Sequence, residues 1–209
     1  ALLRRALDSA AEDGVERIDV ADFPVRYLLP GIDPVAHAAA HALLVERFGF
    51  RPRDTVASMG IDPAKAPEGR QDGPPIRRLE PGEIPVVRDF LCGRFGWDWW
   101  LHMARTLEAR LAGAAIASDI LVAWNGGGPV GVVHYDGARF GPLAVAAPAR
   151  GRGLGTRLTH AALAAMRAHG VGRAYFLIAD ARAERFYGRL GFTVLRRFDR
   201  LRLPLTAPA

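Results

Sequence analysis

A glycine-rich segment, Arg150–Thr156, restricts the fold of this chain more than any other feature of its sequence. It reads Arg-Gly-Arg-Gly-Leu-Gly-Thr. An apolar run with the length of a strand, Phe140–Ala146, precedes it, and an amphipathic helical pattern, Gly153–His169, follows it. Glycines let the backbone turn tightly between the two elements and expose successive N–H groups. The segment therefore predicts a strand–loop–helix unit whose loop and helix start can receive a phosphate.

Two common nucleotide-binding motifs fit this segment poorly. A P-loop requires Gly-Lys followed by Ser or Thr, and no such sequence follows the glycines. A Rossmann motif requires an acidic residue near the end of the next strand, and Asp180 lies somewhat too far along the chain. We therefore expect a phosphate cradle of another kind.

The strands around this segment predict an α/β fold with a mixed sheet. Short turns at Asn125–Gly128 and Asp136–Gly137 join three apolar runs, which indicates antiparallel pairing. The helix after the glycines then provides the crossover that a parallel partner strand needs. The expected strands of this region are Ile76–Leu79, Ile120–Trp124, Val130–Tyr135, Phe140–Ala146, Tyr175–Ile178 and Phe192–Leu203, and the expected helices are Pro81–Arg94, Trp97–Leu111, Gly153–His169 and Ala181–Leu190.

An internal repeat divides the chain. Gly14-Val15 matches Gly170-Val171 at an offset of 156, and Gly49-Phe50 matches Gly191-Phe192 at an offset of 142. We therefore interpret residues 1–60 as the second half of a domain whose complete copy spans 76–205, with a Pro- and Gly-rich linker at 61–75. Because the chain opens inside a helical pattern, we also expect sequence upstream of Ala1. The expected elements of the half copy are a helix at Leu2–Ala11, a strand at Ile18–Val25, a loop at Tyr27–Pro34, a helix at Val35–Phe48 and a strand at Arg53–Met59.

The positive charge of the chain is concentrated near its C-terminus. The formal net charge is +6, and 27 of the 28 basic residues are arginine. Residues 150–202 hold 12 arginines and three acidic residues, a net charge of +9, so the remainder carries −3. Such a field favours a phosphate-bearing ligand, although a solvated arginine-rich surface explains it equally well. We rank nucleic acid below a small ligand because most aromatic residues of this segment fall on predicted core positions.

Composition excludes other classes of protein. The single cysteine, Cys92, rules out an internal disulfide and a cysteine-built metal site, and we expect no metal. No apolar run approaches the roughly 20 residues of a membrane span, and no signal peptide is recognisable. We therefore expect a cytoplasmic protein with no membrane partner.

Two motifs together resemble the GCN5-related N-acetyltransferases (GNAT). Arg150, Gly153 and Gly155 fill the acyl-CoA-binding pattern Gln/Arg-x-x-Gly-x-Gly/Ala of that family. About 30 residues further on, Asp180–Phe192 resembles the family pattern N-x-x-A-x-x-F-Y-x-x-x-G-F, with Asp where the family often has Asn. The resemblance covers 76–205 in full and 1–60 as a degenerate half copy. It implies a GNAT-like acyl-CoA N-acyltransferase fold.

The resemblance also implies an activity, namely transfer of an acetyl group from acetyl-CoA to a primary amine of a small molecule or peptide. Tyr187 is then the general acid that protonates the departing thiolate, since a phenol has a pKa of about 10 against about 8.5 for a thiol. In the family, backbone N–H groups of the strand before the loop hold the thioester carbonyl. The residues implied for acetyl-CoA binding are Leu143, Ala144, Val145, Arg150, Gly151, Arg152, Gly153, Leu154, Gly155, Thr156 and Asp180.

The sequence leaves several roles open. His134 is the candidate general base, and the alternatives are deprotonation through water or through Asp136, Asp98, His102 or Glu108. In the half copy, the position of Tyr187 is occupied by Val45, which cannot supply an acid. The competing function is a catalytically silent acyl-CoA-binding sensor. The acceptor amine, the acyl-chain preference and the oligomeric state are not specified.

Overall fold

A computed structural model describes residues 2–20, 30–67, 72–113 and 117–205. Short 3-10 turns and one π-helical segment supplement the regular elements. The α-helices are α1 (Leu2–Glu12), α2 (Ala38–Ala42), α3 (Ile84–Arg94), α4 (Trp97–Leu111), α5 (Leu154–Ala168) and α6 (Ala181–Gly188). The strands are β1 (Arg17–Asp19), β2 (Arg51–Ile61), β3 (Ile76–Arg78), β4 (Ser118–Asn125), β5 (Gly128–Asp136), β6 (Arg139–Val145), β7 (Ala174–Ala179) and β8 (Thr193–Pro204).

The strands belong to one mixed sheet in the order β1-β8-β2-β7-β6-β5-β4-β3. Strands β3 to β6 pair antiparallel in succession, and β6 pairs parallel with β7. The predicted α/β class, the antiparallel meander and the parallel partner after the helical crossover are all confirmed.

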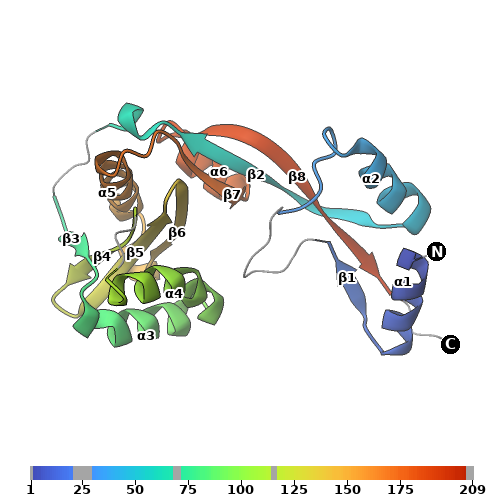
Figure 1. Ribbon diagram of the computed structural model, residues 1–209, viewed down its shortest axis with the longest axis horizontal. Coiled ribbons are helices and arrows are strands. Elements are labelled where there is room, and N and C mark those ends of the chain that lie inside the picture. Colours follow the sequence, from blue (N-terminus) through green and yellow to red (C-terminus); the bar gives the residue numbers. More distant parts are fainter. Residues whose placement is uncertain (1, 21–29, 68–71, 114–116, 206–209) are drawn as a thin grey trace. The chain divides into compact units, whose positions relative to one another are not determined.

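The chain divides into two compact units. Unit 2 comprises residues 59–176 and 185–193 and contains the predicted loop. In this unit α5 covers one face of β4, β5 and β6, whereas α3 and α4 cover the opposite face (Figure 1). The core between α3, α4 and the sheet is formed by buried apolar side chains from all of these elements, among them Val87, Leu91, Met103, Ile120, Val122 and Val132. This packing holds the end of β6 and the start of α5, between which the loop lies.

Unit 1 comprises residues 1–58, 177–184 and 194–209. Its β1 pairs antiparallel with β8, and a small core gathers around Leu7, Phe50 and Leu201. The strand predicted at Ile18–Val25 is present as β1 over Arg17–Asp19, and residues 21–29 lie outside the described part of the chain. The helix predicted at Val35–Phe48 begins at Ala38 and becomes π-helical over Leu43–Arg47.

The repeated segments share backbone geometry. Gly14 and Gly170, which the repeat aligns, both have a φ of 74°, the left-handed conformation that often ends a helix at a glycine. At each glycine, two backbone hydrogen bonds close the end of the preceding helix. Donors and acceptors of the two pairs differ in residue number by the same 156 positions. These bonds run from Gly14 N to Ala11 O (3.1 Å) and Val15 N to Ala10 O (2.9 Å), and from Gly170 N to Arg167 O (2.9 Å) and Val171 N to Met166 O (3.0 Å).

The next helix of each segment follows an aspartate that accepts a backbone hydrogen bond and precedes a glycine with a positive φ, although α2 begins five residues after its aspartate and α6 begins directly after its own. Asp33 accepts a hydrogen bond from the backbone N–H of Ala36 at 2.9 Å, and Asp180 accepts one from Ala183 at 2.7 Å. The two aspartates are 147 residues apart in sequence, whereas the glycines that follow the two helices, Gly49 and Gly191, are 142 residues apart. The segment between the aspartate and the glycine is therefore five residues longer in the first copy. Four of these residues lie between Asp33 and the start of α2 at Ala38, and the π-helical turn at Leu43–Arg47 accommodates the fifth. These matches support the half-copy interpretation, which we retain as a proposal.

No helix in the described ranges has the length and apolar character needed to cross a bilayer.

Candidate functional site

The loop between β6 and α5 depends on two glycines. A 3-10 turn, Ala147–Ala149, follows β6, and α5 begins after Gly153 as its N-cap. Gly151 and Gly153 both have a φ of 76°, and a Cβ atom at either position would meet no atom within 4 Å. The left-handed backbone, and not crowding, therefore requires glycine here. The space above both residues is open to a ligand.

The start of α5 presents unpaired backbone donors. The first bond of the helix joins Arg157 N to Gly153 O at 3.1 Å, so the N–H groups of Leu154, Gly155 and Thr156 have no acceptor within the helix. The N-cap glycine has no side chain, and the first turn holds no acidic residue. The positive end of the helix dipole is thus available to an anion.

Arginines flank these donors. Arg150 is exposed, and its Nε donates to the carbonyl oxygen of Val145 at 2.9 Å. A guanidinium has five N–H donors, so this bond leaves others for a ligand. Arg152 is also exposed. The glycine loop, the helix start and the two arginines together form a site for a phosphate.

The backbone of β6 offers donors on its side facing away from β5. Ala146 N donates to Val130 O at 2.9 Å, and Ala144 stands opposite Val132. Because backbone groups alternate in direction along an antiparallel pair, Ala144 turns its N–H towards β5, whereas Leu143 and Val145 turn theirs away from it. Of the three residues implied for the thioester, only Leu143 and Val145 therefore have the required direction.

The pairing of β6 with its neighbours leaves these groups accessible. Strand β7 pairs with β6 at Arg139 and Tyr175, near the start of both strands, so Leu143 and Val145 lie beyond that pairing. On the other side, the register between β5 and β6 shifts at Gly141 and Pro142. Glycine and proline within an apolar run are typical of such a bulge, and this signal could have located the shift from sequence.

Tyr187 lies in a cluster of aromatic rings. Its ring centroid is 4.5 Å from that of Phe176, 4.8 Å from Phe186, 5.2 Å from Phe192 and 5.8 Å from Phe140. Burial raises the pKa of the Tyr187 phenol well above its usual value. The phenol therefore keeps its proton across the ordinary pH range. Tyr187 therefore holds the proton that a general acid needs, and its raised pKa also makes it a weaker acid towards a thiolate than an ordinary phenol.

His134 is a poor candidate for a base. Its side chain is buried on β5, and its Nε2 lies 2.8 Å from the hydroxyl oxygen of Thr106 on α4, a partner that the sequence did not reveal. Burial lowers the pKa of His134 to about 4, so the ring is neutral at pH 7. An alkylamine has a pKa of about 10.4, and a base this weak gains little from taking its proton. Burial and the low pKa that follows from it therefore disfavour the predicted role.

Two other predicted residues, Asp180 and Asp136, have structural partners. Asp180 belongs to unit 1 and caps α6 through its bond with the backbone N–H of Ala183. Asp136 accepts a hydrogen bond from the hydroxyl of Ser118 at 2.5 Å. A role of Asp180 towards a ligand stays a prediction.

Much of the C-terminal positive charge is neutralised within unit 1. Four arginines of β8 form ion pairs with acidic residues, most of which precede the linker in sequence. The pairs are Arg196 with Asp33 (3.7 Å), Arg197 with Glu184 (2.7 Å), Arg200 with Asp54 (2.5 Å) and Arg202 with Asp19 (2.7 Å). Residues 150–202 therefore do not present one continuous basic face, which weakens the case for nucleic-acid binding.

Residues 117–194 match the family model of the acetyltransferase (GNAT) domain. The chain contains a GNAT domain. The matched range includes the glycine loop, α5 and Tyr187, so the resemblance inferred from the two motifs is confirmed. A search of curated proteins found no match.

Solved structures support the same GNAT fold. The GCN5-related glucosamine N-acetyltransferase region of a fungal multi-domain GH3 β-N-acetylglucosaminidase aligns over 95% of this chain and 27% of its own, with 16% identity and a TM-score of 0.72. A GCN5-related N-acetyltransferase from Sphaerobacter thermophilus aligns over 85% of this chain and 59% of its own, with 23% identity and a TM-score of 0.65. A tandem GNAT protein from the clavulanic acid biosynthesis pathway aligns over 100% of this chain and 70% of its own, with 18% identity and a TM-score of 0.60. The chain thus spans less than two thirds of the first two of these proteins.

Proposed function

We propose that this chain is an acetyl-CoA-dependent N-acetyltransferase that acetylates a primary amine of a small molecule or peptide by direct transfer. The observation that carries the proposal is the uncapped start of α5 after Gly151 and Gly153, inside a GNAT domain. GNAT domains are acetyltransferases, and the donor and acceptor named here are our inference from the site.

The loop fits the pyrophosphate of acetyl-CoA. The space over Gly151 and Gly153 is open, and the N–H groups of Leu154, Gly155 and Thr156 lack helical acceptors. Two negative phosphates suit backbone donors at a helix N-terminus together with the guanidinium groups of Arg150 and Arg152. We assign the cofactor arm to this loop, and the role of Asp180 stays a prediction from the sequence.

The remaining residues act on the reacting groups. In this proposal the backbone N–H groups of Leu143 and Val145 donate to the thioester oxygen, where negative charge develops as the amine attacks. The bond from the acetyl carbon to sulfur breaks, and the Tyr187 hydroxyl gives its proton to the departing sulfur. The amine loses its proton to water, since His134 is too weak a base, and water returns a proton to Tyr187. The products are an amide and a free thiol.

We propose further that only the complete copy, 76–205, supplies this chemistry, with 1–60 as a degenerate repeat and 61–75 as the linker. The helix-end bonds at Gly14 and Gly170 and the alignment with a tandem GNAT protein support this division. The offset of 142 aligns Val45 with Tyr187. If the π-helical turn adds one residue to the first copy, Leu44 aligns with Tyr187 instead. Neither side chain can donate a proton.

The low basicity of His134, the predicted general base, favours a second candidate, a silent acyl-CoA-binding sensor. A turnover assay distinguishes an N-acetyltransferase from a sensor. The chain is incubated with acetyl-CoA and a panel of primary amines, and both the released thiol and the mass of the amine are followed. We expect at least one amine to gain an acetyl group as thiol appears. Tight acetyl-CoA binding without any acetylated product would favour the sensor.

A further inference from the structure

The pairing of β5 with β6 contains one irregular position. Two residues of β6, Gly141 and Pro142, stand opposite the single residue His134, which is the geometry of a β-bulge. The regular pairs on either side are Tyr135 with Phe140 and Val133 with Leu143. Gly141 has a φ of 96°, and proline has no N–H group that an extra residue would leave unpaired. The sequence Gly-Pro therefore favours a bulge at this place.

The bulge decides which backbone groups of β6 face β5. Directly before β6, the carbonyl oxygen of Ala138 accepts a hydrogen bond of 2.9 Å from β7, so the even-numbered residues at the start of the strand face β7. An unbroken alternation would then turn Leu143 and Val145 towards β5. After the bulge, however, the even-numbered Ala146 donates to β5 at 2.9 Å. The extra residue therefore turns the N–H groups of Leu143 and Val145 away from β5, as the proposed thioester site requires.

His134 connects the bulge to α4. Its side chain is buried, and its Nε2 atom lies 2.8 Å from the hydroxyl oxygen of Thr106, which is buried as well. Burial lowers the pKa of His134, whereas the Gly141 backbone acts in the opposite direction, which is the effect of a carbonyl oxygen that faces the ring. Among the described residues the buried Nδ1 atom makes no hydrogen bond, so the bond to Thr106 fixes the orientation of the ring. The imidazole thus links a helix to the bulge inside the core.

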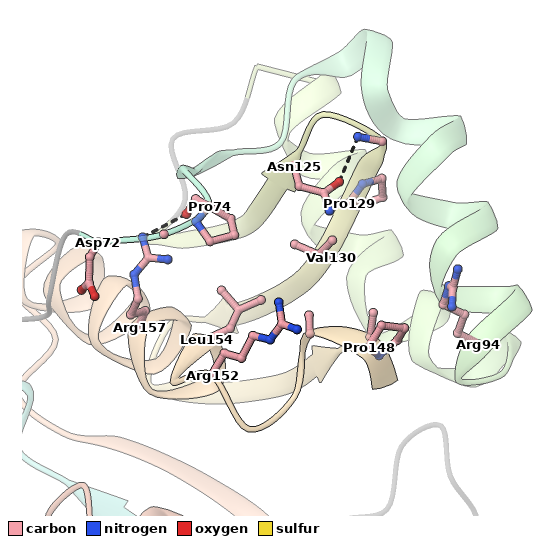
Figure 2. A pocket seen from close by; sticks show the side chains of 14 residues that line it. Asp72, Pro74, Arg94, Asn125, Pro129, Val130, Pro148, Arg152, Leu154 and Arg157 are labelled. Atoms are coloured by element: carbon pink, nitrogen blue, oxygen red, sulfur yellow. Dashed lines mark hydrogen bonds between the residues drawn. The ribbon is translucent and has the colours of Figure 1, made fainter.

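The far end of β6 is held in another way. A pocket of about 660 Å³ lies beside the phosphate loop, and Val130 and Ala146 belong to its lining (Figure 2). The hydrogen bond of 2.9 Å from Ala146 N to Val130 O fastens β6 to β5 at the loop, and His134 takes no part in it. A change at the bulge therefore disturbs Leu143 while the loop keeps its support.

We propose that His134 and Thr106 are positioning residues that hold the bulge of β6 and through it direct the N–H groups of Leu143 and Val145 towards the thioester oxygen. This inference rests on the proposed function, and it gives His134 a role other than that of a base. In this role neither side chain contacts the reacting atoms, and neither gains or loses a proton. Removal of the Thr106 hydroxyl leaves Nε2 of His134 buried without its partner, so the ring is no longer fixed against the bulge.

Variants of both residues test the proposal. Thr106→Val removes the hydroxyl at nearly constant volume, and Thr106→Ser keeps it. His134→Gln keeps a polar group near the position of Nε2, whereas the side chain of His134→Asn is too short to reach Thr106. The matched control is Thr159→Val, because Thr159 is also buried but donates its hydroxyl hydrogen bond to Gly155 O within α5, on the other face of the sheet.

Steady-state rates with an amine that the wild type acetylates are compared with the calorimetric affinity for CoA. We expect Thr106→Val and His134→Asn to lower kcat about 10- to 100-fold at unchanged CoA affinity, because a displaced donor stabilises the transition state less. Thr106→Ser, His134→Gln and Thr159→Val should stay close to the wild type. A kcat in Thr106→Val equal to that in Thr159→Val would overturn the proposal. A parallel loss of kcat and CoA affinity would also overturn it, since a purely structural role predicts that result.

The carbonyl stretch of bound acetyl-CoA gives a second readout, which needs no turnover. N–H groups that donate to a carbonyl lower its infrared frequency, so the band of isotope-labelled acetyl-CoA reports on the donors of Leu143 and Val145. We expect the frequency to fall on binding to the wild type and to fall less in Thr106→Val. If acetyl-CoA binds without any product, the proposed transferase activity fails and this band decides the role of the pair. Equal bands in Thr106→Val and Thr159→Val would then refute it.

If acetyl-CoA does not bind at all, the proposed function fails, and amide hydrogen exchange in the ligand-free protein tests the bulge itself. Ala144 turns its N–H towards β5 just after the bulge, so its exchange is slow while the register holds. We expect Thr106→Val to speed this exchange about tenfold relative to Thr159→Val. Equal exchange of Ala144 in the two variants would show that Thr106 does not hold the bulge.

Discussion

The Nε atom of Arg150 donates a hydrogen bond to the carbonyl oxygen of Val145 at 2.9 Å. One side chain thus closes the turn after β6 and holds the strand end that carries a proposed donor to the thioester. Arg150→Ala removes this bond together with a guanidinium beside the proposed phosphate site. We expect acetyl-CoA affinity to fall about tenfold, since bonds to charged groups contribute about 1.5–3 kcal/mol. Calorimetry measures the loss of acetyl-CoA affinity. The control is Arg167→Ala, which removes an exposed arginine at the far end of α5, and equal affinities of the two variants would exclude Arg150 from the site.

Tyr187→Phe tests the proposed general acid. Phenylalanine keeps the ring contacts with Phe176 and Phe192 and removes only the hydroxyl. General acid catalysis contributes about 10²–10⁴-fold, and we expect a loss in kcat near the lower end, because a thiolate already leaves readily. Acetyl-CoA affinity should change little. A wild-type kcat in this variant would make Tyr187 a packing residue, and an effect on KM alone would make it a positioning residue.

His134 predicts how stability depends on pH. Its pKa is lowered from 6.5 to about 4 in the folded protein, so the unfolded chain binds more protons between these values. The contribution of His134 to the free energy of unfolding is therefore fully present above pH 6.5. It falls by about 3 kcal/mol as the pH is lowered to 4. Urea denaturation at several pH values gives the slope. We expect a shallower slope in His134→Gln than in the wild type, and parallel slopes would contradict the burial of His134.

Gly14 and Gly170 test the proposed repeat. Both have a φ of 74°, and a Cβ atom added at either glycine would meet no atom within 4 Å, so an alanine there adds backbone strain alone. We expect Gly14→Ala and Gly170→Ala each to lower the free energy of unfolding by about 1–2 kcal/mol. Gly172→Ala is the matched control, because Gly172 has open space and no positive φ. Denaturation curves in which only one of the two aligned variants loses stability would count against equivalent helix ends.

Local patterns predicted most of the fold in unit 2. Glycine turns, alternating apolar runs and helical spacing located the meander, and the extent of α4 agrees with its predicted range. These signals depend on neighbours in sequence, and tertiary packing did not override them there. In unit 1 the π-helical turn at Leu43–Arg47 was missed, because an added residue in a helix leaves no distinctive residue type behind.

The site was predictable only where the backbone defines it. The glycines of the loop were recognised because a positive φ restricts the residue type. The partnership of His134 with Thr106 joins residues 28 positions apart on different elements, and no local pattern encodes it. The pocket beside Arg152 likewise combines α3, the β4–β5 turn and α5, so it emerges only when those elements are packed together.

Acetyl-CoA binding to Gly153→Val, measured by calorimetry, tests the central claim most directly. Valine at a φ of 76° forces the loop out of shape and places a side chain in the open space above it. Gly155→Ala is the matched control, because Gly155 has no positive φ and its added Cβ would lie 3.4 Å from Phe186, an ordinary contact. The account predicts no detectable binding to a folded Gly153→Val and near wild-type binding to Gly155→Ala. Wild-type affinity in Gly153→Val would contradict the assignment of acetyl-CoA to this loop.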